Sequence, residues 1–216
     1  MDLPTIFKHI DHTVLGASCA IKDIEQLCKE AIEHNMASVC IPPSFVKQAR
    51  SIFADKLAIC TVIGFPLGYS TTETKLFEAK NALENGADEI DMVINIGNVK
   101  AGDFSAITNE IKKMKDVCGK NILKVIVETC YFTTEEKEAV CKCVTEAGAD
   151  FIKTSTGFGT AGASLADIAL FKQHIGVGVK IKASGGIRTR EDMETFINAG
   201  AERLGTSSAM KLLSEK

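Results

Sequence analysis

Short apolar runs alternate with longer amphipathic stretches along the whole chain. Eight runs predict buried strands, because they are short, rich in β-branched residues and bounded by polar or glycine-containing segments. They are HIDHTVL at 9–15, SVCI at 38–41, KLAICTVI at 56–63, EIDMVI at 89–94, ILKVIV at 122–127, FIK at 151–153, GVKI at 178–181 and RLG at 203–205. The segments between these runs predict helices.

A repeated turn marks the end of four predicted helices. It reads HNMA at 34–37, NGAD at 85–88, AGAD at 147–150 and AGAE at 199–202, each time just before a strand. Glycine or asparagine suits the left-handed position that follows a helix. The alanines at 37, 87, 149 and 201 are 50, 62 and 52 residues apart, so each interval has room for one more strand and helix.

Three predicted helices begin at a capping-box sequence, in which a hydroxyl residue is followed three positions later by an acidic one. The pairs are Ser70 with Glu73, Thr133 with Glu136 and Thr189 with Asp192. These helix starts agree with the strand count.

Strands that are apolar on both faces and alternate with helices predict a parallel sheet covered by helices. Eight strand–helix units in 216 residues average 27 residues each. We therefore expect an α/β fold, a closed (β/α)8 TIM barrel that forms a single domain over residues 1–216. An open doubly wound sheet is the alternative, but it would require a GxGxxG turn after the first strand, which the sequence lacks.

Composition removes several classes of function. With 25 basic and 28 acidic residues and a net charge of −3, the chain has no basic stretch for a nucleic acid. The start, MDLPTIFKHIDHTVL, resembles neither a signal peptide nor a membrane span, so we expect a cytoplasmic protein without a membrane partner. The eight cysteines then predict reduced thiols. His9 and His12 are too few ligands for zinc, and no metal is predicted.

Catalytic groups of a TIM barrel lie at the carboxyl ends of its strands. Charged or nucleophilic residues stand at these ends in five of the predicted strands and directly before a glycine-rich turn in the seventh strand region: Asp11, Cys40, Asp91, Lys124, Glu128, Lys153 and Lys182. Because side chains two apart share a face of a strand, the upper layer of the barrel is expected to be charged.

Lys153 lies in the stretch ADFIKTSTGFG at 149–159, where a short apolar strand meets a loop of Thr, Ser and Gly. An amine in a low-dielectric site either finds partners or loses its proton and becomes a nucleophile. The alternative is a lysine whose head reaches solvent at the end of the strand.

Asp91 interrupts the otherwise apolar run EIDMVINIG. Two interpretations are open: a structural ion pair with Lys124 or Lys153, or a carboxylate that transfers protons through a water. Lys182 stands directly before a glycine-rich turn and is predicted at the rim of the barrel. Lys180 is predicted deeper or at the barrel floor, in a structural role.

A phosphate site is predicted where the loops after the seventh and eighth strands meet, because these loops often hold phosphate through backbone N–H groups. They contain Ser184, Gly185, Gly186, Gly205, Thr206, Ser207 and Ser208, with Arg188 nearby, and the turn of Thr156 and Gly157 faces the same place.

Seven motifs together resemble the deoxyribose-phosphate aldolases, a family of class I aldolases. They are IDHTVL, TVIGFPLG, EIDMVINIG, KVIVETCYFT, ADFIKTSTGFG, KASGGIRT and RLGTSSAMK, and they cover seven of the eight strand ends in order. The resemblance implies reversible cleavage of 2-deoxy-D-ribose 5-phosphate to acetaldehyde and D-glyceraldehyde 3-phosphate, without a metal or organic cofactor. It implies that Lys153 is the Schiff-base lysine, Lys182 the second essential lysine and Asp91 the proton-relay aspartate.

The implied partners are a phosphorylated sugar and aldehydes, and a homo-oligomer is left open. Predicted substrate-binding residues are Asp11, Cys40, Lys124, Thr156, Gly157, Gly185, Gly186, Gly205, Ser207 and Ser208. Lys182 is expected to disfavour the protonated form of Lys153, as a nearby like charge does.

Some positions depart from the usual family pattern, but none is a predicted catalytic residue. They are Gly16-Ala17-Ser18-Cys19, Pro42-Pro43 and Gly68-Tyr69-Ser70, and the tail after Lys211 has no aromatic residue that could close over a pocket. Two alternatives remain. One is another phosphate-binding barrel enzyme, either a transaldolase-like transferase or a sugar-phosphate isomerase that needs no imine-forming lysine. The other is a sugar-phosphate-binding barrel without catalysis.

Overall fold

Eight parallel strands stand side by side in the order of the sequence, and the last strand pairs with the first. The computed structural model describes residues 1–213, so the end of the tail after Lys211 lies outside the described residues. The strands are β1 (Ile10–Thr13), β2 (Ser38–Ile41), β3 (Ile59–Ile63), β4 (Glu89–Val93), β5 (Ile122–Ile126), β6 (Phe151–Lys153), β7 (Lys180–Ser184) and β8 (Arg203–Thr206). The predicted closed barrel is confirmed, and the open doubly wound sheet is wrong.

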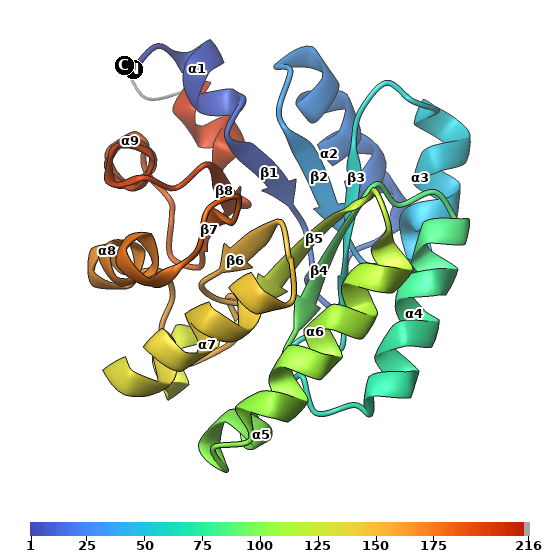
Figure 1. The fold of residues 1–216 in the computed structure, drawn as a ribbon. Coiled ribbons are helices and arrows are strands. Elements are labelled where there is room, and N and C mark those ends of the chain that lie inside the picture. The colour runs from blue at the N-terminus through green and yellow to red at the C-terminus, as the bar shows by residue number, and fades with distance from the viewer. Residues whose placement is uncertain (214–216) are drawn as a thin grey trace.

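Helices surround the barrel, because each strand from β1 to β7 is followed by a helix that returns along the outside (Figure 1). They are α1 (Leu3–Phe7), which precedes β1, then α2 (Ile21–Glu33), α3 (Val46–Phe53), α4 (Thr72–Glu84), α5 (Ile96–Lys100), α6 (Phe104–Cys118), α7 (Thr134–Glu146), α8 (Leu165–His174) and α9 (Arg190–Ala199). Each long helix buries one face. In α2 the buried residues are Ile24, Leu27, Cys28 and Ala31, the spacing of an apolar helical stripe.

The repeated turn has the left-handed conformation that its residues predict. The φ angles are 52° at Asn35, 102° at Gly86, 72° at Gly148 and 119° at Gly200. A residue in this conformation reverses the chain at the end of a helix and directs it into the next strand. The same type of turn therefore precedes four of the eight strands, β2, β4, β6 and β8.

Two of the three predicted capping boxes are confirmed. Thr133 caps α7 with Glu136 and Thr189 caps α9 with Asp192, each pair bonding reciprocally. The prediction at Ser70 is wrong by one residue, because Thr71 is the cap of α4 and its side chain accepts from the N–H of Thr74. Two hydroxyl residues in succession offer the same chemistry, and the path of the chain selects between them.

Strand β7 begins later and ends later than predicted, at Lys180–Ser184 instead of 178–181. Gly178 has a φ of 97° and forms part of the turn that precedes the strand. Lys182 therefore lies inside the strand, not at the rim, and its side chain is fully buried. Lys180 is at the first position of the strand, half exposed, with Glu202 at 3.7 Å.

The barrel interior is charged at the level where such barrels usually hold branched apolar side chains. Along β4 the apolar Ile90 and Met92 belong to the main hydrophobic core, whereas the alternate residues Glu89 and Asp91 are buried carboxylates. Asp91 lies beside Lys124 on β5, which is fully buried too. Among residues 1–213, no helix is both long and apolar enough to cross a membrane.

Another buried ion pair lies outside the barrel, between α4 and α6. The Nζ of Lys75 donates to Glu110 Oε1 at 2.9 Å and to the carbonyl of Val93 at 2.8 Å. Glu110 Oε2 also accepts from the backbone N–H of Asn95 at 3.2 Å. Burial lowers the pKa of Lys75, although Glu110 acts in the opposite direction. The pair ties two helices to the end of β4.

Removing one partner of this pair should destabilise the fold more than removing both. We expect Glu110→Leu to lower the free energy of unfolding by about 3–5 kcal/mol, because it leaves a buried ammonium without a counter-charge. Lys75→Met combined with Glu110→Leu should recover most of that loss. Urea denaturation followed by circular dichroism measures both.

The control is Lys100→Met, which removes the half-exposed ion pair of Lys100 with Glu136 and should cost no more than about 1 kcal/mol. A double variant as unstable as Glu110→Leu alone would contradict the importance of the unpaired charge.

Candidate active site

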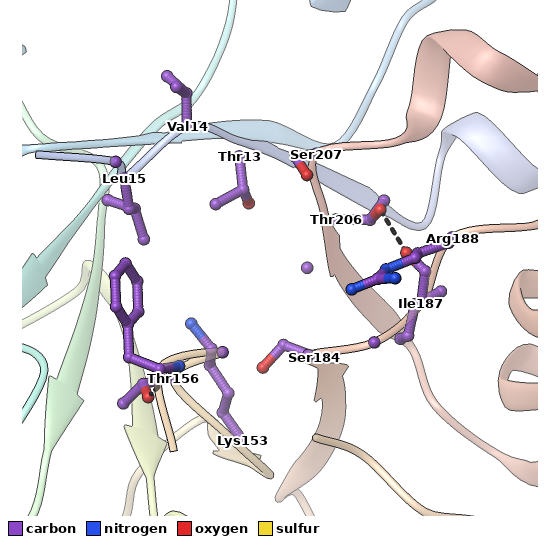
Figure 2. A pocket seen from close by; sticks show the side chains of 16 residues that line it. Thr13, Val14, Leu15, Lys153, Thr156, Ser184, Ile187, Arg188, Thr206 and Ser207 are labelled. Atoms are coloured by element: carbon purple, nitrogen blue, oxygen red, sulfur yellow. Dashed lines mark hydrogen bonds between the residues drawn. The ribbon is translucent and has the colours of Figure 1, made fainter. Parts of the chain in front are cut away.

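A cavity of about 340 Å³ opens where the loops after β6, β7, β8 and β1 meet (Figure 2). Its lining comprises Thr13, Val14, Leu15, Gly16, Lys153, Thr156, Gly157, Phe158, Ser184, Gly185, Gly186, Ile187, Arg188, Gly205, Thr206 and Ser207. Six predicted substrate-binding residues are part of this lining: Thr156, Gly157, Gly185, Gly186, Gly205 and Ser207. The other four, Asp11, Cys40, Lys124 and Ser208, are buried and do not line the cavity.

Lys153 ends β6, and its amine points into the cavity (Figure 2). The side chain is 4% exposed, and Nζ lies 2.7 Å from Asp91 Oδ2. The alternative of a lysine head in solvent is therefore wrong. Among the residues that the structure describes, Lys153 is the only lysine in the cavity lining.

Asp91 is shared by three lysines. Its Oδ1 accepts from Lys124 Nζ at 2.8 Å, and its Oδ2 accepts from Lys153 Nζ at 2.7 Å and from Lys182 Nζ at 2.8 Å. Burial by itself raises the pKa of Asp91, but the charges of the three lysines outweigh burial and hold the pKa well below its usual range. The ion pairs of Asp91 with Lys124 and Lys153, which one of the two interpretations predicted, are thus present. A role of Asp91 in proton transfer stays a prediction.

Lys182 lies directly beside Lys153 on the neighbouring strand, since the two residues are paired in the register of β6 and β7. Its Nζ donates to Asp11 as well as to Asp91. Burial acts to lower the pKa of Lys182, but Asp11 and Asp91 raise it above its ordinary value. Lys182 is thus a fixed ammonium group adjacent to the lysine in the cavity.

Arg203, at the start of β8, completes the charged interior and was not among the predicted site residues. Its guanidinium donates to Asp11 through Nη1 and to Glu89 Oε1 through Nη2 at 2.8 Å. Glu89 Oε2 is in turn 2.6 Å from Lys124 Nζ. The only sequence signal for Arg203 was its parity with Gly205 in the short run RLG, two residues from the predicted phosphate loop.

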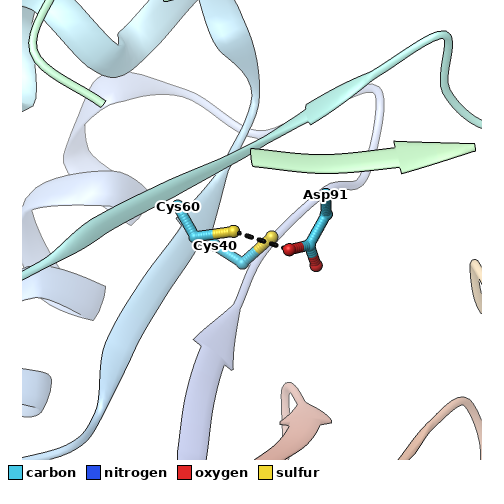
Figure 3. Close-up of side chains that lie close together, drawn as sticks. All are labelled: Cys40, Cys60 and Asp91. Carbon is cyan, nitrogen blue, oxygen red and sulfur yellow. Dashed lines mark hydrogen bonds between the residues drawn. The ribbon is translucent and has the colours of Figure 1, made fainter. Parts of the chain in front are cut away.

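Two thiols lie against the same carboxylate (Figure 3). Cys60 Sγ donates to Asp91 Oδ1 at 3.1 Å, and the sulfurs of Cys40 and Cys60 and a carboxylate oxygen of Asp91 lie within 4.8 Å of one another. These are ligand types that bind soft metals. However, Asp91 is already paired with Lys124, Lys153 and Lys182. The carboxylates around Lys124 and Lys182 raise the pKa of both lysines, and these two charges repel a further cation. The cluster is therefore better described as part of the ion-pair network.

The far end of the cavity has the features of an anion site. Gly185 and Gly186 have φ angles of 84° and 83°, so this loop exposes successive backbone groups in a conformation suited to glycine. The guanidinium of Arg188 points toward the same space, opposite Ser207 (Figure 2). Lys153 and this candidate anion site thus line one cavity.

Gly205 is required for this packing. A Cβ placed at Gly205 would lie 2.9 Å from the Cβ of Ser184 and 3.3 Å from Cε of Lys182. The close approach of β8 to the stem of Lys182 therefore depends on the missing side chain.

Glu128 holds the loop that follows Lys153. It lies just after β5 in the left-handed conformation, with a φ of 55°, and both carboxylate oxygens are 3.2 Å from the backbone nitrogen of Thr156. Burial raises the pKa of Glu128, while the hydrogen bonds from Thr156 act to lower it. Strain of this kind at a non-glycine residue is sustained where the surroundings fix the conformation.

The cavity lining also contains the apolar residues Val14, Leu15 and Phe158, which were not predicted. Phe158 is 58% exposed and stacks edge-on against Phe65, with ring centroids 5.3 Å apart. An apolar residue in a loop carries no sequence signal that separates a cavity wall from ordinary packing.

The comparisons with known proteins agree over nearly the full chain. The family model for DeoC/LacD family aldolases matches residues 5–210. A protein named deoxyribose-phosphate aldolase from Clostridium botulinum is 58% identical over 213 residues, covering 99% of this chain and 96% of that protein. A protein of the same name from Clostridioides difficile is 58% identical over 208 residues, covering 96% of this chain and 95% of that protein.

Solved structures show the same similarity. A putative deoxyribose-phosphate aldolase from Coccidioides immitis superposes with a TM-score of 0.95 at 38% identity and covers 99% of this chain and 86% of its own. The structure described as a unique tetrameric deoxyribose phosphate aldolase from Aeropyrum pernix gives a TM-score of 0.90 at 30% identity, covering 99% and 91%.

The buried thiols lead to a prediction about cysteine reactivity. All eight cysteines are free, and burial raises the pKa of Cys28, Cys118 and Cys141 to about 12. At about pH 8 we expect iodoacetamide to modify Cys19 and Cys130, which are partly exposed, and to leave those three intact because they hold almost no thiolate. Peptide mass mapping measures the modified positions.

The control is the same reaction in urea, where all eight should react. Rapid labelling of Cys28, Cys118 or Cys141 in the folded protein would contradict the environment described for them.

Proposed function

The chain belongs to the DeoC/LacD aldolase family, and on this basis we propose that it reversibly cleaves 2-deoxy-D-ribose 5-phosphate to acetaldehyde and D-glyceraldehyde 3-phosphate. We propose a lysine Schiff base as the intermediate, within the degradation of deoxyribose phosphate. The observation that carries this proposal is the position of Lys153, whose amine is buried, reaches the cavity and lies against Asp91.

Lys153 is the nucleophile in this proposal. As a neutral amine it attacks the aldehyde carbon of the open-chain sugar, and loss of water gives a protonated imine. The imine withdraws electrons as the bond between C2 and C3 breaks, and the proton of the C3 hydroxyl leaves as the new aldehyde forms. The enamine left on Lys153 then takes up a proton at C2, and hydrolysis of the imine releases acetaldehyde.

Asp91 and Lys182 support these steps. Asp91 is a carboxylate in contact with Lys153, so it is placed to pass protons, through a water, between the amine, the C3 hydroxyl and C2. Lys182 stays charged beside Lys153 and opposes a second ammonium there. Gly185, Gly186, Ser207 and Arg188 are the proposed phosphate contacts, which keep the reacting atoms aligned.

The alternatives have less support. A transaldolase-like transferase would use the same buried lysine, but the relatives that match nearly the whole chain are named deoxyribose-phosphate aldolase. A sugar-phosphate isomerase does not require a buried amine in the cavity, and a non-catalytic barrel would not need Lys153 and Lys182 both paired with Asp91. We further propose a cytoplasmic enzyme without metal or organic cofactor that forms a homo-oligomer, as the tetrameric relative from Aeropyrum pernix does.

Trapping of the imine tests the nucleophile. Borohydride added with acetaldehyde, in EDTA, should leave an ethyl adduct on the peptide that contains Lys153, because only an imine is reduced to a stable amine. Lys153→Leu should abolish the adduct at every pH, whereas Lys182→Leu should still form it at high pH. Peptide mass mapping locates the adduct.

Lys180→Leu is the matched control, since Lys180 lies on the same strand as Lys182 but is half exposed and outside the cavity. An adduct found only on Lys180, Lys182 or surface lysines would show that the nucleophile is not Lys153.

A charge reversal tests the phosphate site. Ser207→Glu should raise the KM for 2-deoxy-D-ribose 5-phosphate about tenfold or more, the equivalent of ~1.4 kcal/mol, because a carboxylate repels the phosphate. Turnover of unphosphorylated deoxyribose, which lacks this contact, should change little. Steady-state kinetics on the two sugars measure the difference.

Ser44→Glu provides the control, because Ser44 is exposed after β2 and does not line the cavity. Equal losses on both sugars in Ser207→Glu would place the phosphate elsewhere.

A further inference from the structure

Seven ionisable side chains form one connected network inside the barrel, which we call the barrel charge network. Its members are Asp11, Glu89, Asp91, Lys124, Lys153, Lys182 and Arg203, and each is paired with at least one other. Three are carboxylates and four are cations when protonated. The network therefore holds one more positive group than negative groups, and an excess charge in a buried site is unfavourable.

The four cations do not share the carboxylates equally. Lys124 Nζ has Glu89 at 2.6 Å, Asp91 at 2.8 Å and Asp11 at 3.7 Å. Lys182 contacts Asp11 and Asp91, and Arg203 contacts Asp11 and Glu89. In the described part of the chain, Lys153 has a single carboxylate partner, Asp91. Lys153 is thus the lysine with the least stabilisation of its ammonium form.

Arg203 has a central part in this inequality although it does not line the cavity. Its guanidinium binds two of the three carboxylates at once, Asp11 and Glu89, and not Asp91, the carboxylate that pairs with Lys153. An arginine does not release its proton in a protein, so this positive charge is permanent. The lysines must share what remains of the negative charge.

Other ionisable groups also face Lys153 and belong to the same balance. Glu128 follows β5, and burial raises its pKa while Thr156 lowers it. The hydrogen bond from Cys60 lowers the pKa of Cys40 on β2, whereas burial raises that of Cys60 on β3. These groups stay unchanged when Arg203 or Glu89 is substituted, so they do not alter the direction of the effects below.

We propose that Arg203 and Glu89, neither of which lines the substrate cavity, act as positioning residues that set the pH range in which Lys153 is available as a neutral amine. This inference rests on the proposed function, in which Lys153 forms the imine. Loss of one proton restores charge balance to the network. The proton lost is the one on Lys153, because Lys153 has one carboxylate partner and is the lysine of the network that lines the cavity. The network thereby selects one nucleophile among its own three lysines, Lys124, Lys153 and Lys182.

The two residues should act in opposite directions. Without the charge of Arg203, three carboxylates face three lysines, each lysine gains a counter-charge, and Lys153 keeps its proton to higher pH. Without the charge of Glu89, Lys124 depends more on Asp91, two carboxylates face four cations, and Lys153 loses its proton at lower pH. Removing both charges restores the original excess of one.

The experiment measures the initial rate of imine trapping with acetaldehyde and cyanoborohydride as a function of pH. We expect the midpoint of the profile to move up by about one pH unit in Arg203→Gln and down by about one unit in Glu89→Gln, as expected for one charge at short range. The double variant Arg203→Gln with Glu89→Gln should return close to the parent midpoint. Lys180→Gln is the control. Lys180 lies over the ring of Phe151, as Arg203 does, but it pairs with Glu202 outside the network, so its removal should leave the midpoint unchanged.

Several outcomes would overturn the proposal. A purely structural role would lower the trapping yield at every pH without moving the midpoint, and shifts of the same sign in both single variants would contradict the charge balance. If Arg203→Gln does not fold, Glu89→Gln and the double variant still decide between these results. Failure of the proposed function is distinct, because the parent protein would then show no adduct on Lys153.

Discussion

The hydrogen bonds that the carboxylate of Asp91 accepts from three lysines are the interaction on which the interior of this barrel depends. Three lysine side chains converge on one carboxylate that has no exposed surface. Such a group is tolerated only if every charge has a partner, because desolvation of a lone ion costs several kcal/mol. The strands must therefore present Asp11, Glu89 and Arg203 as well. The proposed catalytic residues thus belong to the same ion-pair network that keeps the interior of the barrel stable.

Much of this arrangement could be predicted from the sequence, and the reason is contrast. Asp91, Lys153 and Lys182 stand out because each is a charged residue next to apolar ones in a short run that otherwise reads as a buried strand, and Lys182 stands directly before a glycine-rich turn. The barrel follows from the regular alternation of strands and helices. The repeated turn at Asn35, Gly86, Gly148 and Gly200 was equally visible, since few residues accept the left-handed conformation. A residue that favours the left-handed conformation and a charged residue within an apolar run can both be recognised from the sequence without knowing which residues lie nearby in the fold.

What could not be predicted depends on which strands adjoin across the barrel. Arg203 begins a strand of four residues, where a charge normally reaches solvent, and only the closure of β8 against β1 brings it to Asp11. Leu15 and Phe158 are apolar loop residues, and nothing local separates a cavity wall from packing. The prediction that Lys182 lies at the rim was wrong because Gly178 turns before the strand, which shifts the strand toward the loop. Sharing of one carboxylate among several cations is a property of three-dimensional proximity alone.

The strand register has a consequence for how the chain avoids folding incorrectly. Asp91 is opposite Lys124, and Lys153 is opposite Lys182. The ionisable residues of the network therefore stand at matching positions on adjacent strands. A slip by one residue would turn these side chains toward the apolar helices and bring Ile90, Met92 or Val125 into the ionic interior. Misaligned barrels would therefore contain isolated charges in hydrocarbon and be strongly disfavoured. The residues proposed to form and cleave bonds therefore also help to fix the register of the strands when the sheet assembles.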